Sequence, residues 1–256
     1  MTQAGRLSGR RAVITGAAGG IARATALEFA RQGARQVLTD LDEDGLARAV
    51  EDVRESGGNV EGFKADVTSE RSVDDLMLRA AGAMGGIDIL VTCAGGYTSY
   101  ASFEQIEPDD WDRVVALNLR SVFLCCRTVV PYMKASGWGR IVNLGSLAGR
   151  STSAGTSPAH YGAAKAAVSV LTQYLAKDVA QYGITANTVA PGTTRTDRVN
   201  ALLTPEKAEA FVRMTPVGYI AAPTDIVPAI VFLASDESRY ITGTTIDING
   251  GRLMLV

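Results

Sequence analysis

Short apolar runs alternate with longer segments of helical periodicity along the first part of the chain. Most of these runs are continuously apolar, which is typical of strands that are buried on both faces of a parallel sheet. Strands are predicted at residues 12–15, 36–39, 60–65 and 87–91. Apolar positions recur every three or four residues between them, which predicts helices at 20–32, 44–56 and 70–84.

The second part of the chain continues the same rhythm. Strands are predicted at residues 140–144, 185–189 and 245–248, and helices at 108–134, 161–182 and 223–234. Pro131 is expected to kink or end the long helix near its last turn. The segment 193–217 is polar and flanked by proline, and it is predicted to form an inserted flap with a short helix near Pro205.

This alternation predicts the α/β class, with one doubly wound parallel sheet of seven strands and helices on both faces. A chain of 256 residues could hold one large domain or two small ones. No linker, low-complexity segment or break in composition divides it. We therefore expect a single domain over residues 1–256.

Composition and charge exclude several classes of protein. The net charge of −2 gives no basic excess, so no nucleic-acid partner is expected. No stretch approaches the eighteen or more apolar residues of a membrane span, and no long apolar segment follows Arg10 and Arg11 as in an export signal. We expect a cytoplasmic protein that does not bind membranes.

The supply of metal-ligating and nucleophilic residues is small. The three cysteines have no CxxC spacing, and His160 is the single histidine, so no metal site is expected. No GxSxG motif surrounds any serine. Cys125 and Cys126 are expected to be small buried apolar residues of the long helix.

A glycine-rich turn lies between the first predicted strand and the first predicted helix. Its glycines would let backbone N–H groups and the helix N-terminus approach a pyrophosphate. The spacing is Gly16-x-x-x-Gly20 instead of GxGxxG, and a tight turn without a ligand is the alternative. The residues expected at the phosphates are Gly16, Ala18, Gly19, Gly20 and Ile21.

Asp40 ends the second predicted strand, twenty residues after Gly20. A carboxylate there could accept hydrogen bonds from both hydroxyls of an adenosine ribose. The next residue is Leu41, so no cation would compensate a 2′-phosphate, and NAD is favoured over NADP. Asp42 and Asp44 are rival candidates, and Asp40 could simply cap the following turn.

Tyr161 and Lys165 lie four residues apart on a predicted helix, so both side chains share one face. A phenol has a pKa near ~10 and exchanges protons poorly at neutral pH. A nearby ammonium, together with a cationic nicotinamide, would stabilise its anion and lower the pKa. A surface Tyr and Lys without this role are the alternative.

With these motifs the chain resembles the short-chain dehydrogenases/reductases over nearly its whole length. The resemblance rests on the turn at 15–21, Asp66-Val67, Ala94-Gly95, Asn118, Ser146, Tyr161-x-x-x-Lys165 and Pro191-Gly192. Singly most of these motifs are weak, and together, in this order, they are specific. The resemblance implies a Rossmann-like seven-stranded sheet and, as the usual assembly, a homotetramer.

The resemblance also implies a role for each matching residue. Tyr161 would be the general acid/base, Ser146 would hydrogen-bond the substrate oxygen, and Asn118 would hold a water that links Lys165 to solvent. Lys165 would also bind the nicotinamide ribose. Further cofactor contacts are expected from Leu41, Asp66, Val67, Cys93, Ala94, Gly95, Pro191, Gly192, Thr194 and Thr196.

The sequence departs from the family pattern in three places. Thr92 and Cys93 stand where two asparagines are common, so the Thr92 hydroxyl must replace a side-chain contact. The fifteen positions from Ser146 to Tyr161 are more than usual, which would reshape the substrate rim. Ala22 stands where the turn usually has its last glycine, a change small enough to keep the packing of helix on strand. His160 lies at a position that varies in the family and is expected to be a loop or rim residue without a catalytic role.

The expected activity is reversible hydride transfer between NAD and a small secondary alcohol or ketone. One alternative is an NADPH-linked 3-oxoacyl-carrier-protein reductase, which Asp40 opposes; another is a non-catalytic dinucleotide-binding regulator, which both Tyr161 and Lys165 oppose. Sugar-nucleotide epimerases share the tyrosine and the lysine, but they usually need a longer C-terminal substrate domain than the residues after Ile248 would provide. Specificity is expected to lie in segments 96–103, 147–160 and 193–217, which contain no clear carboxylate or phosphate clamp. Arg150, Arg195 and Arg198 are candidate anion ligands, and each could instead simply face water.

The helices predicted at 108–134 and 161–182 carry more apolar positions than one sheet face needs. We expect that some of Leu117, Val122, Phe123, Val168, Leu171 and Leu175 face a partner subunit. The apolar tail 253–256 could pack across a second interface and complete a tetramer, or fold back over its own subunit.

Overall fold

The computed structural model describes residues 5–152 and 157–254. All seven strands are parallel and form one sheet in the order β3-β2-β1-β4-β5-β6-β7. This confirms the predicted doubly wound α/β fold. The strands are β1 (Arg11–Thr15), β2 (Arg35–Thr39), β3 (Asn59–Gly62), β4 (Ile89–Thr92), β5 (Gly139–Leu144), β6 (Ile184–Pro191) and β7 (Thr245–Ile248).

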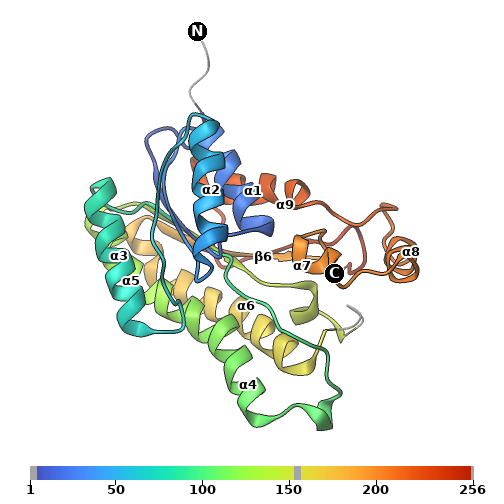
Figure 1. The fold of residues 1–256 in the computed structure, drawn as a ribbon. Helices are drawn as coiled ribbons and strands as arrows, with labels where there is room; N and C mark the ends of the chain where they lie inside the picture. Colours follow the sequence, from blue (N-terminus) through green and yellow to red (C-terminus); the bar gives the residue numbers. More distant parts are fainter. Residues whose placement is uncertain (1–4, 153–156, 255–256) are drawn as a thin grey trace.

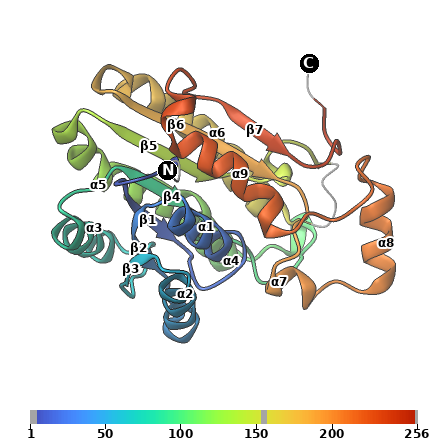
Figure 2. The same cartoon turned by 90° about the horizontal axis from the view of Figure 1, so that it is seen from above.

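Helices cover both faces of the sheet (Figures 1 and 2). One face carries α1 (Gly20–Arg31), α2 (Glu43–Glu55) and α9 (Pro223–Ala234). The other carries α3 (Glu70–Met84), α4 (Pro108–Val115), α5 (Ser121–Ser136) and α6 (Ala159–Val179). Adjacent residues of one strand enter different cores: Ile14 packs with the first group and Val13 with the second. Strands buried in this way must be apolar at successive positions.

The long helix predicted at 108–134 is one continuous rod with a change of pitch. A π-helical turn, η2 (Ala116–Arg120), joins α4 to α5, and the helix passes Pro131 and ends at Ser136. Cys125 and Cys126 are buried in it, as predicted.

Contrary to expectation, the same helix is long and apolar enough to meet the criterion for a membrane span. Its most apolar 18-residue window has a mean hydropathy of 1.5. In the fold, 44 % of that window is buried, because α5 packs against α3, α6 and the sheet. Its apolar residues therefore build the second core.

The flap contains one more helix than predicted. Between β6 and α9 lie α7 (Asp197–Asn200) and α8 (Pro205–Arg213). The hydroxyls of Thr196 and Thr204 accept the backbone N–H groups of Val199 and Lys207, which caps the first turn of each helix. A four-residue helix is too short to produce a hydrophobic period, so the pattern could not predict α7.

Candidate active site

A cleft of about 1250 Å³ opens at the carboxyl ends of the strands. Ligands of such sheets bind where neighbouring strands lead to helices on opposite faces, here between β1 and β4. The volume exceeds the ~300–1,000 Å³ of most small-ligand pockets, so it accommodates a dinucleotide together with a second molecule. Every predicted cofactor residue lines it: Gly16, Ala18, Gly19, Gly20, Ile21, Asp40, Leu41, Asp66, Val67, Cys93, Ala94, Gly95, Tyr161, Lys165, Pro191, Gly192, Thr194 and Thr196.

The glycine-rich turn leaves no room for side chains. Gly16 has φ +72°, and a Cβ on it would lie 2.7 Å from the backbone nitrogen of Ala94. Gly20, the first residue of α1, has φ +57°, and its Cβ would lie 2.9 Å from Cγ2 of Thr196. Gly19, directly before α1, has only Asp197 Oδ2 near its Cβ position, at 3.9 Å, so a phosphate can approach the backbone there and the cradle fits a dinucleotide.

The Asp40 carboxylate is held at the cleft beside this turn. Its Oδ2 accepts the Ala18 N–H at 3.0 Å and its Oδ1 accepts the Asp42 N–H at 3.0 Å. The rival Asp42 instead caps α2 by accepting the Gly45 N–H, and Asp44 does not line the cleft. Among the described residues, the lysines and arginines that line the cleft are Lys165, Arg198 and Lys207, which come from α6 and the flap.

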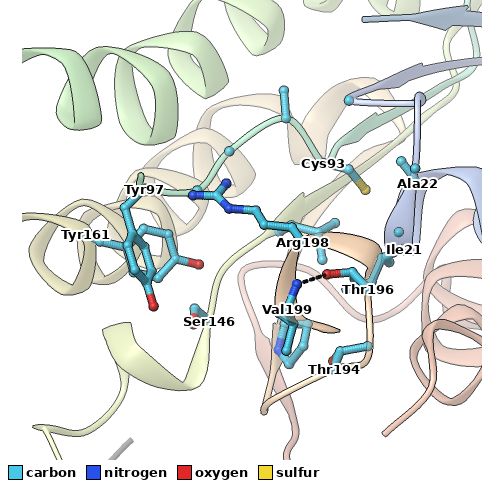
Figure 3. A pocket seen from close by; sticks show the side chains of 18 of the residues that line it. Ile21, Ala22, Cys93, Tyr97, Ser146, Tyr161, Thr194, Thr196, Arg198 and Val199 are labelled. Carbon is cyan, nitrogen blue, oxygen red and sulfur yellow. Dashed lines mark hydrogen bonds between the residues drawn. The ribbon is translucent and has the colours of Figure 1, made fainter. Parts of the chain in front are cut away.

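Ser146 and Tyr161 lie near each other in the cleft, away from the glycine-rich turn (Figure 3). Lys165 lines the same cleft. Ser146 follows β5, and its Oγ accepts the Ala148 N–H at 3.1 Å, which leaves its hydroxyl proton for another acceptor. Lys165 is buried one helical turn from Tyr161, and its Nζ donates to the Leu144 carbonyl at 2.7 Å. The same Nζ lies 5.9 Å from the centre of the Tyr161 ring.

In the protein alone, the pKa of Tyr161 is raised, which corrects part of the expectation. Burial of the phenol is the largest cause, and it outweighs the lowering by the neighbouring Ser146 hydroxyl and by the Arg198 charge. Burial also lowers the pKa of Lys165 to about 8. Lys165 therefore does not make Tyr161 acidic in the protein alone.

Asn118 is fully buried in the π-helical turn and does not line the cleft. Its amide accepts the Gly96 N–H at 2.7 Å and donates to the Gly96 carbonyl at 2.7 Å and to the Val114 carbonyl at 2.8 Å. A Cβ on Gly95 would lie 2.7 Å from Asn118 Oδ1 and 3.1 Å from Lys165 Nζ. Asn118 thus fixes the loop after β4 close to Lys165, and its water-holding role stays a prediction.

His160 is not the loop or rim residue that we expected. It lies in the first turn of α6 and is fully buried, with Nε2 at 3.2 Å from Oδ2 of Asp110 on α4. Its ring stacks on Trp111 at 6.4 Å between centres. The side chain does not line the cleft. It links α4 to α6 through a buried polar contact. The sequence around His160 could not predict this contact, because Asp110 lies fifty residues earlier in the chain.

Residues of all three segments that are predicted to determine specificity line the cleft, and their role in specificity stays a prediction. The loop after β4 contributes Gly96–Tyr100, the segment after β5 contributes Leu147, Ala148 and Ser157, and the flap contributes Leu202, Leu203, Lys207 and Phe211. Residues 153–156 of the second segment lie outside the described residues. Sequence reasoning did not single out Tyr97, whose ring lies 4.9 Å from the Tyr161 ring, because no motif surrounds it.

The departures from the family pattern have structural explanations. Thr92 Oγ1 donates to Asn143 Oδ1 at 2.8 Å, and Asn143 donates onward to Thr172 at 2.9 Å, so the Thr92 hydroxyl enters a buried polar network. Cys93 is half-buried on the wall of the cleft, and the loss of solvent around its thiol raises the pKa of that thiol to about 12. It is therefore an unreactive thiol at neutral pH.

A dinucleotide cradle joined to a buried lysine and to a half-buried tyrosine and serine defines an oxidoreductase of the nicotinamide-dependent class. A family model described as Enoyl-(Acyl carrier protein) reductase matches residues 16–252. With the relatives reported below, this match establishes that the chain belongs to the short-chain dehydrogenases/reductases.

The similar proteins include enzymes of different substrates. The chain is 38 % identical to cyclohexanol dehydrogenase of Rhodococcus sp. (strain TK6), over 96 % of each chain. It is 38 % identical to a 3-oxoacyl-acyl-carrier-protein reductase of Thermotoga maritima, over 96 % of this chain and 98 % of the relative. A putative gluconate dehydrogenase from Agrobacterium tumefaciens has a similar structure, with a TM-score of 0.92, 35 % identity and 98 % of both chains covered.

Proposed function

We propose that the protein is an NAD(H)-dependent dehydrogenase that interconverts a secondary alcohol and a ketone. The observation that carries the cofactor choice is Asp40, whose carboxylate is fixed at the ribose end of the cleft by two backbone N–H groups. The described cations of the cleft come from the opposite side, and Leu41 is 61 % exposed at the rim. A 2′-phosphate at this position would meet a carboxylate without a compensating charge.

The bound nicotinamide would supply the hydride acceptor or donor. Tyr161 Oη holds the proton that leaves or joins the substrate oxygen, and the Ser146 hydroxyl donates to that oxygen as negative charge develops on it. Lys165 stabilises the phenolate form and binds the nicotinamide ribose. Thr194 and Thr196 would hold the carboxamide of the bound nicotinamide.

The alternative of an NADPH-linked 3-oxoacyl-carrier-protein reductase rests on the Thermotoga relative. Asp40 opposes it for the reason given above. A non-catalytic dinucleotide-binding regulator is opposed by the assembled Ser146, Tyr161 and Lys165. We also propose that residues 1–256 form one domain, with a substrate flap at 193–217, and that the protein is cytoplasmic.

The test is a panel of secondary alcohols assayed with NAD and with NADP at the absorbance of reduced nicotinamide. NAD should give the higher kcat/KM with every alcohol that is oxidised. Asp40→Ala combined with Leu41→Arg should narrow or reverse that ratio, because it removes the carboxylate and adds a cation. Equal or better wild-type activity with NADP would overturn the cofactor assignment.

A further inference from the structure

Arg198 is a cation of the cleft that has no role in the proposed binding of the cofactor. Of the three arginines considered as anion ligands, Arg150 is paired with Asp247 at 3.1 Å and Arg195 is exposed outside the cleft. Arg198 lines the cleft. In the described part of the chain, no carboxylate lies within ion-pair distance of it. Its guanidinium is therefore available to a ligand.

The guanidinium is placed next to the reacting end of the cleft. Arg198 extends from α7 across the cleft toward the loop after β4 (Figure 3). Its guanidinium carbon lies 5.6 Å from the centre of the Tyr97 ring, which in turn lies 4.9 Å from the Tyr161 ring. A Cβ on Gly96 would come within 2.7 Å of that carbon, so the glycine leaves the space that Arg198 fills.

Its neighbours in sequence point to a different part of the cleft. Thr196 packs against Gly20, and Oδ2 of Asp197 lies 3.9 Å from the Cβ position of Gly19, so both lie beside the phosphate turn. Arg198 instead faces Tyr97 and is close enough for its charge to lower the pKa of Tyr161. The anion that Arg198 could bind thus belongs to the substrate, and the cofactor phosphates lie nearer to Thr196 and Asp197.

The charges that line the cleft are divided in the same way. The carboxylates are Asp40, Asp42, Asp66 and Asp197, and they lie at the cofactor half or beside Gly19. The flap adds Arg198 and Lys207 at the substrate half, together with apolar Leu202, Leu203 and Phe211. This half therefore favours a ligand with an anionic group and an apolar body.

We propose that Arg198 determines specificity by binding a carboxylate of the substrate, so that the enzyme acts on a hydroxy acid and the corresponding oxo acid. This inference rests on the proposed function. The carboxylate takes no part in bond making: hydride leaves the carbinol carbon for nicotinamide, the hydroxyl proton goes to Tyr161, and the carboxylate stays ionised. The apolar part of the substrate packs on Tyr97.

The experiment compares acids with their neutral esters. The probes are lactate and β-hydroxybutyrate, each beside its methyl ester, oxidised with NAD by the wild type, Arg198→Met, Arg198→Lys and Arg195→Met. Loss of a charged hydrogen bond should lower kcat/KM for the acid about 10- to 100-fold in Arg198→Met. In the same variant, kcat/KM for the ester should change far less. Arg198→Lys should recover part of kcat/KM for the acid, and Arg195→Met should have the wild-type values for both substrates.

Two further readouts locate the anion. Arg198→Met should bind NADH as the wild type does; weaker binding would assign the guanidinium to the cofactor phosphates and overturn the proposal. Butyrate should inhibit oxidation of a neutral alcohol competitively in the wild type and lose that inhibition in Arg198→Met. This arm decides the question even if neither hydroxy acid is itself oxidised.

The remaining outcomes separate this inference from the proposed function. A wild type that prefers the esters, or an Arg198→Met variant that loses acid and ester activity equally, would overturn the carboxylate site and leave the dehydrogenase intact. Failure to oxidise any alcohol of the panel would instead remove the proposed function itself.

Discussion

At the scale of single residues, the active site consists of polar groups whose burial is unfavourable on its own. Lys165 is buried and Tyr161 is half-buried, and burial shifts the pKa of each group in the direction that favours its neutral form. Burial of an ammonium is tolerated here because Nζ retains one strong hydrogen bond, to the Leu144 carbonyl. Such a site lowers stability in exchange for a proton-transfer group that is already in position.

This trade-off predicts that Lys165→Met is more stable than the wild type at neutral pH. Folding lowers the pKa of Lys165 from 10.5 to about 8, so the unfolded chain binds more protons between those values. Wild-type stability should therefore rise with pH across that window. Below about pH 8 the buried Lys165 is charged, and the full cost of burying its ammonium then lowers stability. Removing the ammonium should raise the free energy of unfolding by up to about 3 kcal/mol, less the loss from the unpaired Leu144 carbonyl.

Denaturant unfolding at pH 7 and pH 10 measures this effect. The advantage of Lys165→Met should be largest at pH 7 and shrink toward pH 10. Lys177→Met, at an exposed position of the same helix, is the control and should change stability little at either pH. A Lys165→Met variant that is less stable than the wild type at pH 7 would show that the ammonium is not destabilising.

At the scale of elements, α5 and α6 each use one face for the core and leave apolar side chains on another. The expectation that several of the named residues point outward is only partly correct. Val122 and Val168 are buried, and Leu117, Leu171 and Leu175 pack against the core from partly buried positions. Phe123 on α5 is 45 % exposed, and Val170 and Tyr174 on α6 are exposed as well.

We predict that these exposed side chains lie in a subunit interface and that the protein is a homotetramer near four times 26.9 kDa. Phe123→Glu should shift the mass to a smaller species in light scattering at low micromolar concentration, because it buries an unpaired charge in the interface. Leu78→Glu on α3, where Leu78 is 65 % exposed, is the matched control and should keep the wild-type mass.

A wild type of monomer mass would remove this interface. A wild type of dimer mass would contradict only the second interface, the one expected from the C-terminal tail. In that tail Met254 is 75 % exposed, and residues 255–256 lie outside the described residues.

At the scale of the whole molecule, the sequence predicted what depends on repeated patterns. Strands buried on two faces need apolar runs, and the α3, α9 and β7 bounds follow directly from such patterns. The cofactor cleft was also predictable, since its residues follow strand ends at one edge of the sheet. These features are local in sequence or are fixed by the topology.

What the sequence missed depends on contacts between distant segments. His160 on α6 makes a polar contact with Asp110 on α4, and the Asn118 side chain accepts the Gly96 N–H. The guanidinium of Arg198, from the flap, lies over the Tyr97 ring. The raised pKa of Tyr161 likewise depends on the depth of the cleft, which no spacing encodes. The π-helical turn at Ala116–Arg120 lacks a residue pattern of its own and was read as ordinary helix.

The most direct test of the proposed dehydrogenase is Tyr161→Phe, assayed with NAD and an alcohol that the wild type oxidises. Removing one hydroxyl should leave NADH binding near the wild-type value, while kcat falls by about two orders of magnitude or more, because the proton has no acceptor at that position. Tyr174→Phe, at an exposed tyrosine of the same helix, should retain wild-type kcat. Retention of most activity by Tyr161→Phe would contradict the assignment of proton transfer to this site.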